Sequence, residues 1–156
     1  MRVLLNNEAG QAIPVEYIMT FMISMIFLGI MTMTFNSAID NYSSQAVRIE
    51  LKDTGNLISS AITSMYVTTP CNGVNSISLD VPVEIGGKGY FVEISDSDPF
   101  GNDDKVLKLT SFRNSITTYV SLNSIDALIE IDGSATSSSG KILITGSTSE
   151  ITISQG

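Results

Sequence analysis

The residues with the clearest potential for site chemistry are four aspartates in one short polar segment. These are Asp96, Asp98, Asp103 and Asp104, and carboxylate oxygens are the preferred ligands of a hard cation such as Ca²⁺. The spacing is not that of an EF-hand, and the closing glutamate of that motif is missing. Acidic loops are more often only solvated, so a calcium site is the lesser of two interpretations.

Other kinds of catalytic chemistry are largely excluded by composition. The sequence has no histidine, which excludes Ser-His and Cys-His nucleophiles and all metal sites built on imidazole. Cys71 is the only cysteine, so no intrachain disulfide or thiolate cluster can form, and we interpret it as a small packed residue. No carboxylates are paired as in a glycosidase. We therefore predict that the chain is not an enzyme and holds no cofactor.

The charge balance argues against a nucleic-acid partner. The 156 residues carry a formal net charge of −8, and the eight basic residues are scattered from Arg2 to Lys141 without forming a block. A nucleic-acid-binding protein would show a basic patch or stripe. The length suits one globular domain together with an anchoring segment.

A long uncharged segment lies near the N-terminus. No charged residue occurs in the 23 positions between Glu16 and Asp40, which as a helix would extend roughly 35 Å at ~1.5 Å per residue. That length exceeds the ~30 Å hydrocarbon core of a bilayer, so we expect this helix to enter a membrane. The hydroxyls inside it can bond back to helix carbonyls; they belong to Thr20, Ser24, Thr32 and Thr34.

An ordinary cleaved secretory signal fits this segment poorly. Such a signal has a shorter apolar region, basic charge before it and a small-x-small cleavage site after it. Here the acid Glu16 comes directly before the apolar run, and no such site follows. Arg2 weakly favours a cytoplasmic N-terminus.

The residues that precede the apolar segment have the order of another kind of export signal, not that of an ordinary secretory signal. A polar stretch ends at Gly10, then Gln11-Ala12-Ile13-Pro14-Val15-Glu16-Tyr17 runs directly into the apolar helix. This order resembles the class III signal of type IV prepilins, especially archaeal ones, over about the first 35 residues. The resemblance implies that a prepilin peptidase removes the polar leader and that the apolar helix is retained.

The same resemblance assigns the processing and assembly residues. The cut would fall between Gly10 and Gln11, and Glu16-Tyr17 would match the family's Glu-aromatic pair. Glu8-Ala9 stand where members usually have Lys or Arg, and Glu16 is sixth from Gln11 where the family has its glutamate fifth. A cut after Gln11, which would leave Ala12 first, is the alternative.

Glu16 has a physical reason to need a partner. A carboxylate at the head of an apolar helix is costly once water is excluded, so it should pair with a cation. The resemblance implies the free amino group of an adjacent subunit. We also expect Glu16 and Pro14 to lie in the first helical turn; the simpler alternative is a glutamate exposed to headgroups.

Beyond Phe35 the helical periodicity continues with more polar residues. Gly55 weakens this stretch by roughly 1 kcal/mol relative to Ala and marks a candidate bend, and Thr68-Thr69-Pro70 should end it. Asn41 begins the only N-x-Ser/Thr sequon, but it would lie near a filament core, so we favour the unmodified side chain. The stripe predicted to face a folded domain contains Val47, Leu51, Ile58, Ile62 and Met65.

From Val74 onward the pattern changes to the period of strands. Alternation from Ile77 to Ile85 predicts one strand, and Asp132-Gly133 predicts a turn that opens a Ser-rich loop. Short strands joined by turns predict an antiparallel meander or a small sandwich. Further strands are predicted near residues 90–94, 106–112, 116–122, 127–131, 141–145 and 151–154.

Together these patterns predict an α+β, pilin-like fold in which a long hydrophobic, then amphipathic, helix packs on a C-terminal antiparallel sheet or small sandwich. The predicted parts are a leader at residues 1–10, a membrane or filament-core helix at 11–38, its amphipathic continuation at 39–69, and an extracellular β-rich head at 70–156.

The function that the resemblance implies is that of a structural subunit of an extracellular type IV pilus-like filament used in surface attachment. Its partners would be copies of itself, the prepilin peptidase and an assembly platform in the cytoplasmic membrane, where the precursor resides. The alternative is a single-span anchored protein whose external head binds a ligand or partner without polymerising. Adhesive pilus, archaellum-like filament and minor pilin remain open, as does archaeal against bacterial origin.

Overall fold

The computed structural model describes residues 9–69, 73–96, 105–112, 115–122, 125 and 128–156, with side chains from Pro14 onward. Contacts divide the chain into two compact units, Met1–Tyr42 and Ser43–Gly156. Each unit is described by itself below.

One helix, α1 (Ala9–Thr68), accounts for all the described part of the first unit and the start of the second. Its 60 residues include Pro14, which lies inside the helix and not in its first turn. Glu16 lies beyond the first turn as well, so the predicted first-turn placement of both residues is wrong for the uncut chain, because α1 already begins at Ala9. The helix ends at Thr68, as the Thr68-Thr69-Pro70 sequence predicted.

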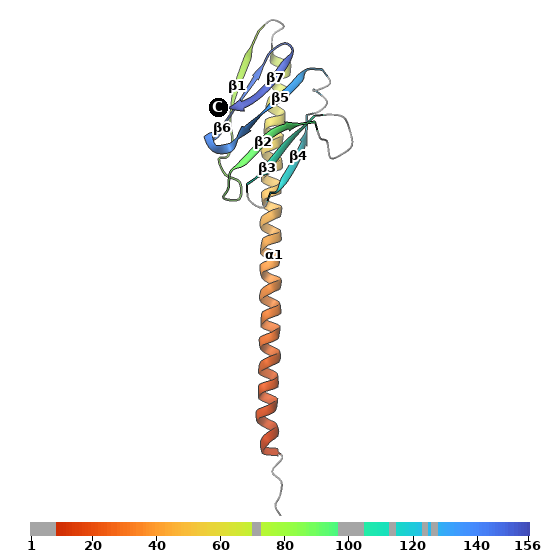
Figure 1. The fold of residues 1–156 in the computed structure, drawn as a ribbon, viewed down its shortest axis with the longest axis vertical. Coiled ribbons are helices and arrows are strands. Elements are labelled where there is room, and N and C mark those ends of the chain that lie inside the picture. Colours follow the sequence, from red (N-terminus) through yellow and green to blue (C-terminus); the bar gives the residue numbers. More distant parts are fainter. Residues whose placement is uncertain (1–8, 70–72, 97–104, 113–114, 123–124, 126–127) are drawn as a thin grey trace, which may run out of the picture. The chain divides into compact units, whose positions relative to one another are not determined.

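The second unit contains a single seven-stranded sheet with the order β1-β6-β7-β5-β2-β3-β4 (Figure 1). Neighbouring strands pair antiparallel except β5 and β7, which run parallel from Glu130↔Glu150 to Gly133↔Ile153. β1 and β4 therefore form the two edges of the sheet. The strands are β1 (Asn75–Asp80), β2 (Tyr90–Ser95), β3 (Val106–Ser111), β4 (Thr117–Ser121), β5 (Glu130–Thr136), β6 (Lys141–Gly146) and β7 (Glu150–Gln155).

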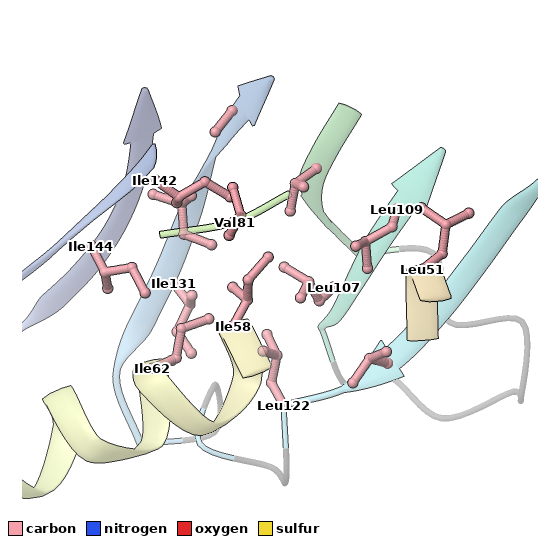
Figure 2. Close-up of a cluster of buried hydrophobic side chains, with 14 of the residues drawn as sticks. Leu51, Ile58, Ile62, Val81, Leu107, Leu109, Leu122, Ile131, Ile142 and Ile144 are labelled. Carbon is pink, nitrogen blue, oxygen red and sulfur yellow. The ribbon is translucent and has the colours of Figure 1, made fainter. Parts of the chain in front are cut away.

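The core lies between the C-terminal part of α1 and one face of this sheet. Figure 2 shows Leu51, Ile58 and Ile62 of the helix among side chains of the sheet and its connections. The whole predicted stripe is buried, since none of its five members is more than 3% exposed. Burying an aliphatic side chain contributes about 1.5–3 kcal/mol, so this stripe stabilises the position of the helix on the sheet. The sheet side contributes Leu107, Leu109, Ile131, Ile142, Ile144, Ile151 and Ile153 among others.

Two strand predictions need correction. The strand predicted from Ile77 to Ile85 ends at Asp80, because Pro82 has no N–H to continue the ladder. Asp132-Gly133 is not a turn but lies within β5. There Gly133 has φ 119°, and a Cβ on it would stand 2.2 Å from the Ile153 carbonyl oxygen of β7. Only glycine allows the two backbones to approach in this way.

The α+β fold with a long helix packed on a β-rich head is confirmed. The head is one sheet and not a sandwich, and the parallel β5–β7 pair makes the sheet mixed.

Candidate assembly helix and head-domain sites

The N-terminal part of α1 exposes apolar side chains on every side. From Val15 to Phe35 its large apolar residues are between 43% and 77% exposed, and none of its most apolar 18-residue window is buried. The core helix of a soluble protein would bury such residues. Length and composition make α1 a candidate transmembrane segment, which associates the chain with a membrane.

The hydroxyls inside this apolar surface are satisfied by the helix itself. Thr20 Oγ1 donates to the Glu16 carbonyl at 2.9 Å, and Ser24 Oγ donates to the Thr20 carbonyl at 2.8 Å. Thr32 and Thr34 make the same bonds to Leu28 at 2.8 Å and Ile30 at 2.9 Å. The predicted back-bonding is confirmed, and it lowers the cost of placing these side chains in lipid.

Glu16 and Tyr17 are consecutive exposed residues of α1, and Tyr17 is 75% exposed. Glu16 forms no ion pair with any residue that the structure describes. A carboxylate in this position is accessible to a cation from another molecule. Gly10 and Gln11, the predicted cleavage residues, belong to the helical backbone at the start of α1, and residues 1–8 of the predicted leader lie outside the described residues.

The predicted calcium ligands are mostly outside the described residues. Asp98, Asp103 and Asp104 belong to that group, while Asp96 is described and exposed. Its Oδ1 lies 3.7 Å from Lys105 Nζ, so a lysine already neutralises part of its charge. In the described ranges no three His, Cys, Asp or Glu side chains gather to hold a metal ion. Cys71 is also outside these ranges, and Asn41, the sequon residue, is exposed on α1.

The head contains one short ion pair across neighbouring strands. Lys108 Nζ of β3 donates to Glu93 Oε1 of β2 at 2.6 Å, and the two residues are direct register partners. This hydrogen bond, with the charge of Glu93, raises the pKa of the Lys108 amine. Both side chains are about one-third exposed, so we interpret the pair as support for the β2–β3 register, not as catalytic chemistry.

Among the described residues, Tyr90 at the start of β2 has a buried side-chain polar atom without a hydrogen-bond partner. It is 0% exposed, and its hydroxyl has no hydrogen-bond partner in the described part of the chain. Burial raises its pKa to about 12. Its backbone N–H donates to Ser137 Oγ at 3.0 Å, and that hydroxyl donates to the Val83 carbonyl at 2.6 Å. This arrangement joins three chain segments and is structural.

A shallow groove follows α1 beside the edge strand β4. One part of it, about 330 Å³ in volume, is lined by the cations Arg48 and Lys52 and by the apolar Ile49. Sequence reasoning missed this groove because its opposite wall is β4, more than sixty positions further along the chain. The spacing of Arg48 and Lys52, four residues apart on one helix face, was the only local signal. The β4 wall consists of Thr117, Thr118 and Tyr119.

A family model matches residues 7–154, and its description is a family of unknown function, DUF7266. The match spans α1 and the described sheet except Gln155, the last residue of β7, so the chain belongs to this family. No curated protein and no solved structure gives a significant match.

Proposed function

We propose that this chain is the structural subunit of an extracellular type IV pilus-like filament, assembled by packing of its N-terminal helices after the leader is removed. The observation that carries the proposal is the contrast along α1. Its C-terminal part buries one apolar stripe in its own sheet, whereas its N-terminal part exposes apolar residues all round. A helix that is apolar on all sides must be covered by lipid or by other helices.

A filament supplies that cover from identical copies. The same surface that is stable in lipid in the precursor packs against neighbouring helices in the polymer. Methionine side chains adapt to either environment because they are unbranched and polarisable. Gly29 helps such packing, since nothing lies within 4 Å of a Cβ built on it in the single chain, and small residues let helices approach closely. Five methionines lie on this surface, namely Met19, Met22, Met25, Met31 and Met33.

In this proposal Glu16 directs assembly. Leader removal creates a free α-amino group at Gln11, or at Ala12 if the cut falls one residue later. The exposed Glu16 carboxylate of one subunit pairs with that amine on the next. Away from water this pair is strongly favoured over either charge alone. The prepilin peptidase, a membrane assembly platform and a role in surface attachment belong to the same proposal.

The test compares two acids of α1 in cells that express the full-length chain together with its processing and assembly machinery. Glu16→Ala should reduce the yield of filaments sheared from the surface by about tenfold or more, because it leaves the buried amine unpaired. Asp40→Ala is the matched control, since Asp40 is also an exposed acid of α1 but lies beyond the apolar run. It should assemble like the unmodified chain.

Membrane levels of each variant are measured in parallel, so that lost assembly is distinguished from lost expression. Normal filament yield from Glu16→Ala would remove the assigned role of Glu16. If the unmodified chain formed no filament and remained a dispersed membrane protein, the proposal itself would be wrong, and the single-span anchored protein with a binding head would replace it.

A further inference from the structure

The groove beside β4 carries positive charge that the described part of the chain does not neutralise. Arg48 and Lys52 are both exposed, lie one helical turn apart, and form no ion pair with a described residue. By contrast, Lys105, Lys108 and Lys141 each lie within 4 Å of a carboxylate oxygen. Lys88 is a third described cation without an ion pair, so what distinguishes Arg48 and Lys52 is that both lie in one groove.

The same groove also offers apolar contact. Ile49 is 55% exposed there, and Tyr119 of β4 forms part of the opposite wall. Apolar and aromatic residues surrounded by polar groups are typical of the centre of a protein–protein contact. Charge and shape together indicate a surface for an acidic protein segment.

The sheet of the same chain carries an acidic surface whose charge is opposite to that of the groove. Glu130 and Glu150 are direct register partners on the parallel strands β5 and β7, and Asp132 follows two residues after Glu130. All three carboxylates are exposed. The neighbouring residues in the two strands are buried in the core, Ile131 between Glu130 and Asp132 and Ile151 next to Glu150. Because side chains alternate along a strand, the three carboxylates share the face of the sheet that points away from α1. We call Glu130, Asp132 and Glu150 the acidic triad.

The acidic triad is also without a cation. None of its carboxylates forms an ion pair within the described ranges, and the described residues contain no cluster that would hold a metal ion there. Like charges on adjacent strands repel one another. A cationic partner would therefore relieve an unfavourable arrangement, not merely add a contact.

We infer that the acidic triad of one subunit docks in the groove of Arg48 and Lys52 on a neighbouring subunit. This inference rests on the proposed filament function. The two surfaces are different patches of the same chain, so their contact is heterologous, and the subunit at each end of a row keeps one of its two surfaces free. A contact of this type propagates from copy to copy, as a filament requires, whereas a self-complementary patch would stop at a dimer.

The first test looks for the contact itself in membranes and filaments that contain the full chain. Heavy-isotope-labelled and unlabelled chains are co-assembled and treated with a carbodiimide, which joins an amine directly to a carboxylate. Mass spectrometry should find Lys52 joined to Glu130, Asp132 or Glu150 in peptide pairs of mixed isotope content. Mixed content proves that two copies are joined, since links to Glu50 or Asp53 of the same helix carry a single label.

The second test exchanges the charges. Arg48→Glu with Lys52→Glu should lower the filament yield about tenfold, and Glu130→Lys with Glu150→Lys should lower both the filament yield and the mixed cross-link from Lys52 about tenfold. All four substitutions together should restore the filament yield to within about twofold, because the pairing is reversed but complementary. The mixed cross-link should then join the new carboxylate at position 52 to the new amine at position 130 or 150. Lys88→Glu is the control for Lys52→Glu, since it reverses one exposed lysine that forms no ion pair with a described residue and does not touch the groove, and it should have little effect.

The outcomes separate this inference from the filament proposal. Normal filament yield from the charge-reversed variants, together with no mixed cross-link from Lys52 in filaments of the unmodified chain, overturns the docking contact and leaves the filament function standing. Mixed cross-links in membranes that never yield a filament support the contact and overturn the filament function. Cross-links from Lys52 only to another protein, or protection of Lys52 only by vesicles of anionic lipid, would also overturn the inference.

Discussion

Ser59 of α1 donates a 3.0 Å hydrogen bond to the backbone carbonyl of Ser121, 62 residues further along the chain. Ser59 is 5% exposed, and Ser121 is the last residue of the edge strand β4. The bond therefore joins the helix to the edge of the sheet, next to the buried stripe that contains Ile58 and Ile62. It also sets the position of β4, which forms one wall of the proposed docking groove.

Removing this hydroxyl should destabilise the head. Ser59→Ala loses a buried hydrogen bond, and the expected decrease in the free energy of unfolding is about 1 kcal/mol. Ser60→Ala is the matched control, because its exposed side chain lies one position further along the same helix and should change stability by less than about 0.5 kcal/mol. Thermal unfolding of both full-length variants in detergent checks this, and equal stability of the two would contradict it.

Gly55 should not tolerate alanine, although alanine favours a helix. A Cβ at this position would stand 2.7 Å from Val120 Cγ2 and 2.8 Å from Leu109 Cδ1. The helix gains about 1 kcal/mol from the substitution, but overpacking of a core costs about 1–3 kcal/mol. Because Val120 is β-branched and stiff, we expect a net loss of about 1 kcal/mol.

The control for this prediction is Gly29→Ala in the same helix. A Cβ there meets nothing within 4 Å, so in the detergent-solubilised monomer the variant should be as stable as the unmodified chain or slightly more stable. Chemical denaturation monitored by circular dichroism compares the two variants. If Gly55→Ala stabilised the head as much as propensity alone predicts, the close approach of α1 to β3 and β4 would be wrong.

Tyr90 should make the head sensitive to alkaline pH. Burial raises its pKa from an ordinary value of 10.0 to about 12, so the unfolded chain loses this proton at lower pH than the folded chain does. The associated stability is fully present below pH 10 and is lost as the pH rises through about 12, with a total loss of about 3 kcal/mol.

Tyr90→Phe removes both the titrating group and the unpartnered hydroxyl. Below pH 10 this variant should equal the unmodified chain in stability or exceed it by up to about 1 kcal/mol. Between pH 10 and 12 the free energy of unfolding of Tyr90→Phe should exceed that of the unmodified chain by a steadily growing amount, as measured by denaturant unfolding at a series of pH values. Tyr119→Phe, at a half-buried tyrosine of β4, is the control for the removal of a tyrosine hydroxyl from the head. A constant difference between Tyr90→Phe and the unmodified chain at all pH values would disprove the role of burial.

Much of the fold follows from local patterns. The spacing of Val47, Leu51, Ile58, Ile62 and Met65 identifies the buried stripe of α1, and most of the strands lie where alternating residues predict them. The end of β1 could also have been found, since Pro82 interrupts the alternation. The parallel β5–β7 pair and the position of β5 between β7 and β2 could not, because strand order depends on pairings between distant segments. Gly133 suggested a turn for the same reason. Its actual role is to let β5 approach the backbone of Ile153 in β7, which comes twenty residues later in the chain.

The candidate sites divide in the same way. Glu16, Tyr17 and the back-bonded hydroxyls belong to one continuous helix, so their sequence order is enough to place them. The groove of Arg48 and Lys52 and the acidic triad each combine residues from distant segments. Their residue types are ordinary in sequence, and only the fold brings them into one surface.

Mass spectrometry of the mature N-terminus, on this polypeptide from sheared surface fibres and from membranes, decides whether the chain is processed and assembled as proposed. We expect the fibres to contain the chain beginning at Gln11, or at Ala12, with the apolar helix retained. A chain that keeps Met1, found only in membranes and absent from the fibres, would contradict this expectation.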